Sequence, residues 1–308
     1  MNLDSRIFVA GGRGLVGSAT VRILRERGYT NVLAPTREEL DLMDTKAVSN
    51  FFETKKPEYI VLAAARAGGI KASMTYPAEF LYENLVIQNN VIWQAHRTGV
   101  KKLLFLGSSC IYPGRAPQPM KEEYLLTGPF EPTNEGYSIA KIAGLKLCEY
   151  MFTQFKDTFI SCMPSNLYGE GDYFDHGRGH VIASLMLRMH EAKQSNTSEV
   201  VVWGTGNVRR EFLYVDDLAE ALVFLLESYD QKEFLNVGSG SDVSIKELAE
   251  IIKTVVGYEG RLVFDVSKPE GVAQKLLDVS KINALGWRSH TSLADGLTKT
   301  YAAFLATH

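Results

Sequence analysis

The sequence predicts an α/β protein built on a doubly wound parallel sheet, with a smaller α/β domain toward the C-terminus. Short apolar runs alternate with amphipathic stretches over the first two-thirds of the chain, which is typical of successive βαβ units. A glycine-rich turn follows the first apolar run, as in Rossmann-type domains. Beyond Asn166, glycines and polar residues interrupt the pattern. We therefore expect one domain over residues 1–165 and a second mainly over 166–308, with segments near 211–240 returning to the first.

The expected elements follow in chain order. The first unit has a strand at 7–10, a helix at 15–27 and a strand at 31–34, because apolar residues recur with strand and then helix periodicity. Similar patterns predict strands at 58–64, 102–107, 159–163 and 211–214, and helices at 78–98, after Tyr137, at 181–192 and at 216–227. A last helix is expected at 244–256, where Ser244 and Glu247 have the spacing of a capping box.

Composition excludes several classes of protein. The formal charge is −3 from 33 basic and 36 acidic residues, so a nucleic-acid partner is not expected. No apolar run approaches the length of a membrane helix, and the first residues lack the apolar region of a signal peptide. Three cysteines without CxxC spacing exclude a disulfide scaffold. We expect a cytoplasmic protein without a metal site.

A glycine loop lies between the first strand and its helix. It can be read as G-x-x-G-x-x-G or as G-x-G-x-x-G, and such loops let the backbone approach a pyrophosphate at a helix N-terminus. A loop in this position predicts a dinucleotide site. Its residues are Gly11, Gly12, Arg13, Gly14, Leu15, Val16 and Gly17.

The residues after the second strand favour NADP(H) over NAD(H). NAD-binding domains usually place an acidic residue there to bind the ribose 2′-hydroxyl, whereas this chain has Arg37. Arg37 and Arg13 are therefore expected at a 2′-phosphate, with Asp41 and Leu42 beside the adenine. Two alternatives stay open, since Arg37 also belongs to an exposed charge run and Asp41 also suits a helix entry.

Tyr137 and Lys141 form the single Y-x-x-x-K in the chain, and this spacing puts both side chains on one face of a helix. A nearby ammonium is expected to lower the pKa of the phenol and make it an acid/base group. Ser108 or Ser109, at the end of a predicted strand, is placed to bind an oxygen on which charge develops. The combination predicts hydride transfer at a carbonyl or carbinol carbon.

These motifs resemble the extended short-chain dehydrogenase/reductase superfamily, and more narrowly the GDP-L-fucose synthases. The likeness covers nearly the whole chain. It rests on the strand end Gly107-Ser108-Ser109-Cys110-Ile111-Tyr112-Pro113, on Glu131–Glu135, Ala140–Gly144 and Asn166–Gly169, and on the later motifs Arg210–Asp217, Asn236–Gly238 and Leu285–Trp287.

The resemblance implies a bifunctional enzyme that epimerises C3 and C5 of GDP-4-keto-6-deoxy-D-mannose and reduces C4 with NADPH. It implies that Tyr137 donates a proton to the C4 oxygen with Lys141 as its partner. Ser108 then binds that oxygen, and Cys110 and His180 form the epimerisation acid/base pair. A structural role stays open for Cys110 as a buried small residue and for His180 at a helix start.

The resemblance also implies binding residues. Further cofactor contacts are expected at Leu106, Gly107, Ser108, Ser109, Lys141, Pro164, Ser165, Asn166, Leu167 and His180. Substrate contacts are expected at Arg188, Trp203, Arg210, Glu270 and Lys275, although Glu270 stands where the family commonly has Asp, and Arg188 also suits a solvated helix face. A homodimer is expected through the apolar outer faces of the two long helices. Leu85, Ile92, Leu145 and Cys148 lie in these helices, but burial inside the monomer explains them equally well.

Three other functions remain open at this stage. A 4-epimerase or 4,6-dehydratase has the same fold, but dehydratases usually carry an acidic residue where this chain has Ser109-Cys110. A sibling synthase making GDP-colitose or a heptose analogue is poorly separated by sequence. A regulator that only senses NADP(H) usually loses the Tyr-Lys pair, which this chain retains.

Overall fold

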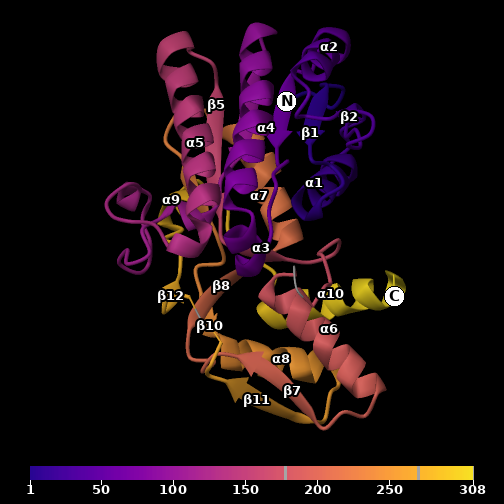
Figure 1. The fold of residues 1–308 in the computed structure, drawn as a ribbon. Helices are drawn as coiled ribbons and strands as arrows, with labels where there is room; N and C mark the ends of the chain where they lie inside the picture. The colour runs from indigo at the N-terminus through magenta and orange to yellow at the C-terminus, as the bar shows by residue number, and fades with distance from the viewer. Residues whose placement is uncertain (177–178, 269–270, 308) are drawn as a thin grey trace.

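The computed structural model describes residues 1–176, 179–268 and 271–307. Its N-terminal elements surround a parallel sheet in the upper part of Figure 1, and α6, α8, α10, β7 and β11 make the lower part. The upper sheet confirms the predicted doubly wound fold. Its six strands lie in the order β2 (Val32–Leu33), β1 (Ile7–Ala10), β3 (Tyr59–Leu62), β4 (Lys102–Leu106), β5 (Phe159–Pro164) and β9 (Leu235–Val237), all paired in parallel.

Helices cover both faces of this sheet, as expected for strands whose residues are buried on both sides. On one face, α1 (Leu15–Glu26) and α7 (Val215–Ser228) build an apolar core with the strands. On the other face, α2 (Thr45–Lys55), α4 (Pro77–Arg97) and α5 (Glu135–Phe155) build a second core. The short helices on the carboxyl side of the sheet are α3 (Ile70–Thr75), η1 (Ser109–Ile111), η2 (Glu122–Tyr124) and η3 (Pro132–Asn134).

The lower part has a third apolar core between helices and two small sheets. The helices are α6 (Val181–Gln194), α8 (Ile245–Val256) and α10 (Leu293–Thr307). In one sheet β8 (Arg209–Tyr214) pairs with β10 (Asp242–Ser244), β12 (Gln274–Lys275) and β6 (Asn166–Tyr168); in the other β7 (Glu199–Trp203) pairs with β11 (Arg261–Asp265). The short α9 (Ser280–Ala284) follows β12.

Most predicted elements are confirmed to within three residues at either end. The Ser244 capping box is confirmed, because Ser244 Oγ accepts from the Glu247 amide at 3.1 Å and Glu247 Oε2 accepts from the Ser244 amide at 2.7 Å. Two expectations differ. Residues Asn166–Tyr168 form β6 instead of starting a loop, and β8 pairs within the lower sheet, although its Leu213 packs in the upper core together with residues of α7 and β9.

The four apolar residues considered for a dimer contact do not form the outer faces of the two long helices. Ile92, Leu145 and Cys148 are buried in the core beneath α4 and α5, and Leu85 is half-buried. The exposed large apolar side chains on these helices are instead Tyr82, Trp93, Ile139, Tyr150 and Phe155. Within the described ranges, no helix is both long and apolar enough to cross a membrane.

Candidate active site

The glycine loop lies at the carboxyl end of β1, where the strand order reverses between β1 and β3. Ligands of doubly wound sheets bind at this kind of switch point. Gly11 has φ +83°, and a Cβ there would lie 2.8 Å from the Ala64 backbone nitrogen at the end of β3, so a side chain does not fit. Gly14 precedes the first turn of α1, which contains Leu15 and Val16 and leaves backbone N–H groups directed toward the loop.

A cavity of about 430 Å³ opens beside this loop. The four side chains expected around the adenosine end of the cofactor, Arg13, Arg37, Asp41 and Leu42, all line it, together with Gly11 and Gly14. The Arg37 side chain is 79% exposed, with its Nε 4.0 Å from Asp41 Oδ1. A glycine cradle and two guanidinium groups around one cavity fit an adenosine that carries phosphates.

The end of β4 brings three candidate catalytic groups together. Gly107 packs against Met163, since a Cβ there would lie 2.1 Å from its sulfur. Ser108 then starts η1, where its Oγ accepts a hydrogen bond from the Cys110 amide at 3.3 Å. Ser109 is buried, whereas Cys110 is partly exposed and its carbonyl accepts from Ser138 Oγ at 2.7 Å. Of the two serines, Ser108 is thus the one that faces Cys110.

Tyr137 lies in the first turn of α5 and faces this strand end. Burial raises the pKa of its phenol, the nearby Cys110 raises it further, and a hydrogen bond with Ser108 opposes the rise. The Lys141 ammonium lies 5.7 Å from the Tyr137 ring centroid but donates its hydrogen bond to the Leu106 carbonyl at 2.8 Å. The expectation that Lys141 lowers the tyrosine pKa was therefore wrong for this state of the chain, because burial dominates and the phenol keeps its proton.

Lys141 is itself buried, and desolvation lowers the pKa of its ammonium to about 8.

The end of β5 carries further expected cofactor contacts. Pro164 is the last residue of this strand, and the buried hydroxyl of the next residue, Ser165, has no hydrogen-bond partner among the described residues. Asn166 and Leu167 continue into β6, where Asn166 Nδ2 donates to the Glu211 carbonyl at 2.8 Å. Ser165 thus offers a free polar group at the edge where the cofactor is expected.

His180 is exposed immediately before α6. Asp172 is its charged neighbour, a residue that the sequence did not single out. Burial raises the pKa of Asp172 while His180 lowers it, and the carboxyl Oδ2 is buried with no hydrogen-bond partner in the described part of the chain. No local motif marks Asp172 as a neighbour of His180.

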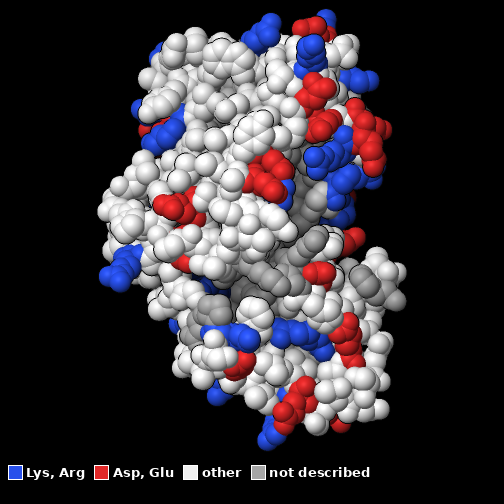
Figure 2. Space-filling view, in the orientation of Figure 1, with Lys and Arg blue, Asp and Glu red and all other residues white. Residues whose placement is uncertain are grey.

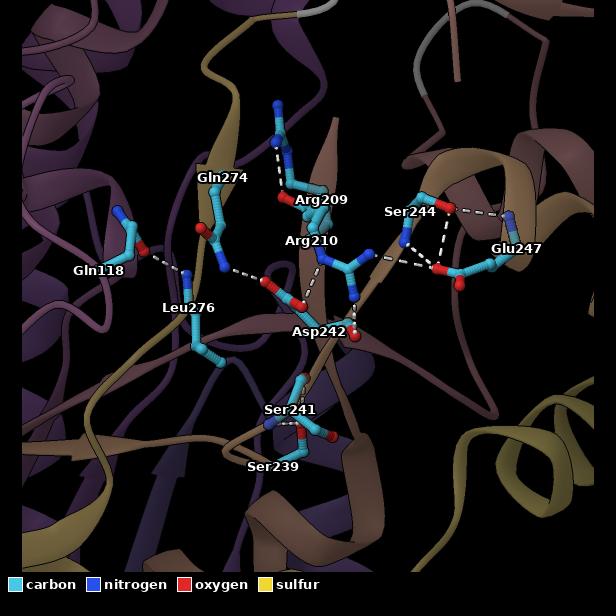
Figure 3. Close-up of polar contacts among 10 residues, drawn as sticks. All are labelled: Gln118, Arg209, Arg210, Ser239, Ser241, Asp242, Ser244, Glu247, Gln274 and Leu276. Atoms are coloured by element: carbon cyan, nitrogen blue, oxygen red, sulfur yellow. Dashed lines mark hydrogen bonds and ion pairs between the residues drawn. The ribbon is translucent and has the colours of Figure 1, made fainter. Parts of the chain in front are cut away.

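The expected substrate residues that the structure describes lie on α6, β7, β8 and β12 of the lower part, namely Arg188, Trp203, Arg210 and Lys275. Basic side chains gather on this part of the surface in Figure 2. Arg188 donates to the Ser184 carbonyl at 3.2 Å and the Val201 carbonyl at 2.5 Å, and burial lowers its pKa. Trp203 is 51% exposed at the end of β7. Arg210 Nη1 donates to the Arg209 carbonyl at 2.7 Å (Figure 3), while Glu270 lies outside the described residues.

Lys275 lies beside Cys110. Its Nζ is 3.9 Å from the Cys110 sulfur, although the two residues are 165 positions apart. No cluster of three or more potential His, Cys, Asp or Glu metal ligands occurs among the residues that the structure describes. The site therefore combines a nucleotide cavity, a Ser-Tyr-Lys group and a cysteine with a cationic neighbour.

The parallel sheet, its glycine loop and the Ser-Tyr-Lys group define an oxidoreductase of the extended short-chain dehydrogenase/reductase class. The model of the NAD dependent epimerase/dehydratase family matches residues 7–238. A GDP-L-fucose synthase of Arabidopsis thaliana is 56% identical over 98% of this chain and 94% of its own length. The chain belongs to this family and, within it, to the GDP-L-fucose synthases.

Two solved structures are also similar over at least 96% of both chains. A GDP-6-OMe-4-keto-L-xylo-heptose reductase from Campylobacter jejuni has a TM-score of 0.96 at 37% identity, with 100% of this chain and 99% of that chain covered. A GDP-L-fucose synthetase from Naegleria fowleri bound to NADP has a TM-score of 0.91 at 28% identity, with 100% and 96% covered. The fold of this chain thus resembles that of a structure that holds NADP.

Proposed function

We propose that the protein converts GDP-4-keto-6-deoxy-D-mannose to GDP-L-fucose by 3,5-epimerisation and NADPH-dependent reduction at C4. The observation that carries the proposal is the group formed by Ser108, Cys110 and Tyr137 at the end of β4. This group offers two hydroxyl donors for one ketone oxygen, and it adds a thiol for the neighbouring carbons. When bound, NADPH supplies the hydride for C4, and the loop of Gly11–Gly17 with Arg13 and Arg37 would hold it.

For the reduction, Tyr137 donates a proton to the C4 oxygen as that oxygen gains negative charge. The raised pKa of the phenol keeps this proton in place until charge develops. Ser108 donates a hydrogen bond to the same oxygen and stabilises the charge. Lys141, held against the Leu106 carbonyl, keeps a buried ammonium beside the ring and favours the phenolate that proton transfer leaves behind.

For the epimerisation, one group removes a proton from C3 or C5 and a second group returns a proton to the opposite face. The electron pair of the broken C–H bond forms an enolate, whose oxygen Ser108 and Tyr137 stabilise. We assign the two proton-transfer roles to Cys110, which lies on η1 after β4, and to His180, which lies immediately before α6. Arg188, Trp203 and Arg210 would bind the GDP-sugar, and Leu106, Gly107, Ser109, Pro164, Ser165, Asn166 and Leu167 would contact the cofactor.

The direct test incubates the protein with NADPH and GDP-4-keto-6-deoxy-D-mannose in D₂O. We expect NADPH to be consumed and NMR to identify GDP-L-fucose with deuterium at C3 and C5. In Cys110→Ser the hydroxyl hardly ionises near neutral pH, so deuterium incorporation falls steeply while the unepimerised ketone is still reduced to D-series products. His180→Gln is expected to impair inversion in the same way.

The outcomes separate the alternatives. If the protein leaves this substrate unchanged but reduces a 4-keto-3,6-dideoxy or heptose nucleotide, it is a sibling synthase. Normal inversion in Cys110→Ser at the wild-type rate would remove Cys110 from the mechanism. Binding of NADPH without turnover of any of these nucleotides would leave only a sensing role.

We also propose that the protein is a cytoplasmic homodimer. Exposed apolar side chains on α4 and α5 support the dimer, and three unpaired cysteines, one at the site, support a reducing compartment. We propose that residues 1–165 mainly bind NADP(H) and that 166–308 mainly bind the GDP-sugar. Fractionation of the native source tests the compartment, and light scattering tests the dimer.

A further inference from the structure

The contact between Lys275 and Cys110 joins the two parts of the molecule at the reacting site. Cys110 lies on η1, directly after the sheet strand β4, whereas Lys275 ends β12 in the lower part. Lys275 Nζ and Cys110 Sγ are 3.9 Å apart, which is close enough for a charge-assisted contact. Since no local spacing links these residues, the contact depends on how β12 is held.

Side chains on both sides hold β12 in place (Figure 3). Gln274 pairs with Arg209 of β8, and its Nε2 donates to Asp242 Oδ2 at 2.5 Å. The Leu276 amide donates to Gln118 Oε1 at 2.8 Å, and the next amide, of Leu277, donates to Glu211 Oε2 at 2.8 Å. Hydrogen bonds therefore hold the residues immediately before and after Lys275, and these bonds fix the position of Lys275 in its short strand.

Among the described residues, Lys275 of β12 and Tyr137 of α5 are titratable neighbours of the Cys110 thiol. The phenol keeps its proton and carries no charge, so the ammonium is the charged neighbour of the sulfur. A cation at this distance stabilises the thiolate, which is the form of cysteine that accepts a proton from carbon or attacks an electrophile.

We infer that Lys275 is a positioning residue, whose ammonium orients the Cys110 side chain and stabilises the negative charge that the sulfur carries when it reacts. The inference deepens the proposed function, on which the catalytic meaning of the thiolate rests. The charge state of the thiol itself is independent of any substrate. It can therefore be measured even if the protein proves to act on another sugar nucleotide.

The other two cysteines do not interfere with such a measurement. Cys148 and Cys162 are buried in the two cores of the sheet, and burial raises the pKa of each thiol to about 12. Cys110 is partly exposed. An alkylating reagent is thus expected to modify Cys110 alone in the folded chain.

The experiment measures alkylation of the full chain by iodoacetamide and by iodoacetate without substrate, with peptide mass spectrometry to locate the label. The thiolate sulfur attacks the CH₂ carbon and displaces iodide. In Lys275→Met we expect the rate at pH 7 to fall about tenfold, the pH profile of alkylation to move to higher pH, and the preference for the anionic reagent to disappear. Lys275→Arg restores most of the rate, because it keeps the charge.

Exposed Lys232 provides the matched control, and Lys232→Met is expected to leave alkylation unchanged. Thermal melting verifies that each variant is folded, and Lys275→Gln replaces Lys275→Met if the apolar side chain unfolds β12. In substrate-containing D₂O, Lys275→Met should lower deuterium incorporation at C3 and C5 more than it raises the KM for the GDP-sugar. Unchanged alkylation kinetics in folded Lys275→Met and Lys275→Gln would overturn the inference, and a raised KM alone would then make Lys275 a substrate ligand.

Discussion

Tyr137 illustrates how one residue depends on its surroundings for its role. Its buried phenol is protonated at neutral pH and lies beside Ser108, so it is prepared to give a proton. We expect Tyr137→Phe to lower the rate of ketone reduction by about 10²–10⁴. NADPH binding, followed by fluorescence titration, should stay close to wild type. Tyr150→Phe removes an exposed hydroxyl from the same helix and is expected to retain full activity; near-normal reduction by Tyr137→Phe would contradict the assignment.

Arg37 lines the nucleotide cavity with an exposed guanidinium and is expected to distinguish NADPH from NADH. A charge-assisted pair with a 2′-phosphate contributes about 1.5–3 kcal/mol, and solvent exposure places this residue at the lower end of that range. Arg37→Ala should therefore weaken NADPH binding by about tenfold and leave NADH binding nearly unchanged. Calorimetric titration with both nucleotides measures the difference. Equal affinities in the wild-type protein would refute the role.

Residues with a local signal could be predicted from the sequence, and residues without one could not. The glycine loop, the Tyr137–Lys141 spacing and the serine-cysteine strand end each depend on a few neighbouring positions. Asp172 beside His180 follows from the path of a loop, and the Lys275 contact with Cys110 follows from the anchoring of a distant strand. The pKa direction of Tyr137 was also wrong at the sequence level, because burial cannot be inferred from spacing alone.

At the scale of elements, β8 holds the lower sheet against the site through the buried side chain of Glu211. Its carboxylate accepts from the Leu277 and Gly240 amides, each at 2.8 Å, and burial raises its pKa to about 7. A carboxyl whose folded-state pKa is raised favours the folded state most at low pH. That stabilisation is lost as the pH rises from about 4.5 through 7, because only the unfolded chain ionises easily there.

Glu211→Gln tests this linkage, because the amide does not titrate. The free energy of unfolding of the wild type, relative to Glu211→Gln, is expected to fall by about 2 kcal/mol between pH 5 and pH 8. Urea denaturation at the two pH values measures it. Glu233→Gln, at an exposed position in the loop before β9, serves as a control without such a trend. A relative stability that stays constant over the same interval would show that Glu211 is ionised throughout.

The long helices α4 and α5 were predicted well, because they carry their helical pattern over 21 residues each. Helices α2 and α10 were not predicted from the sequence. Strands of two or three residues, such as β10 and β12, have too few positions for a period to appear. They form because β8 offers hydrogen-bonding partners on both of its edges. Sequence periodicity therefore does not identify β10 and β12. Lys275 is a residue of β12, so its position could not be predicted from periodicity either.

At the scale of the whole molecule, the exposed Trp93 of α4 and Tyr150 of α5 predict that two copies associate. Each side chain buries apolar area only if a second surface covers it. We expect the wild-type protein to be a dimer at micromolar concentration and the double variant Trp93→Glu/Tyr150→Glu to be a monomer with an unchanged circular dichroism spectrum. Light scattering distinguishes these states. Met74→Glu introduces the same charge at an exposed position outside α4 and α5 and should leave the dimer intact.

The position of β9 at the edge of the upper sheet has a consequence for how the protein is synthesised. β9 pairs with β5 only after the 70 intervening residues have been made. Helix α7, which covers one face of the sheet, lies in this intervening stretch and is also made late. A nascent chain that ends near residue 165 thus exposes an apolar sheet face and an unpaired strand edge. Such surfaces aggregate readily, so a ribosome-bound or truncated N-terminal fragment is expected to need chaperone protection until α7 and β9 have emerged.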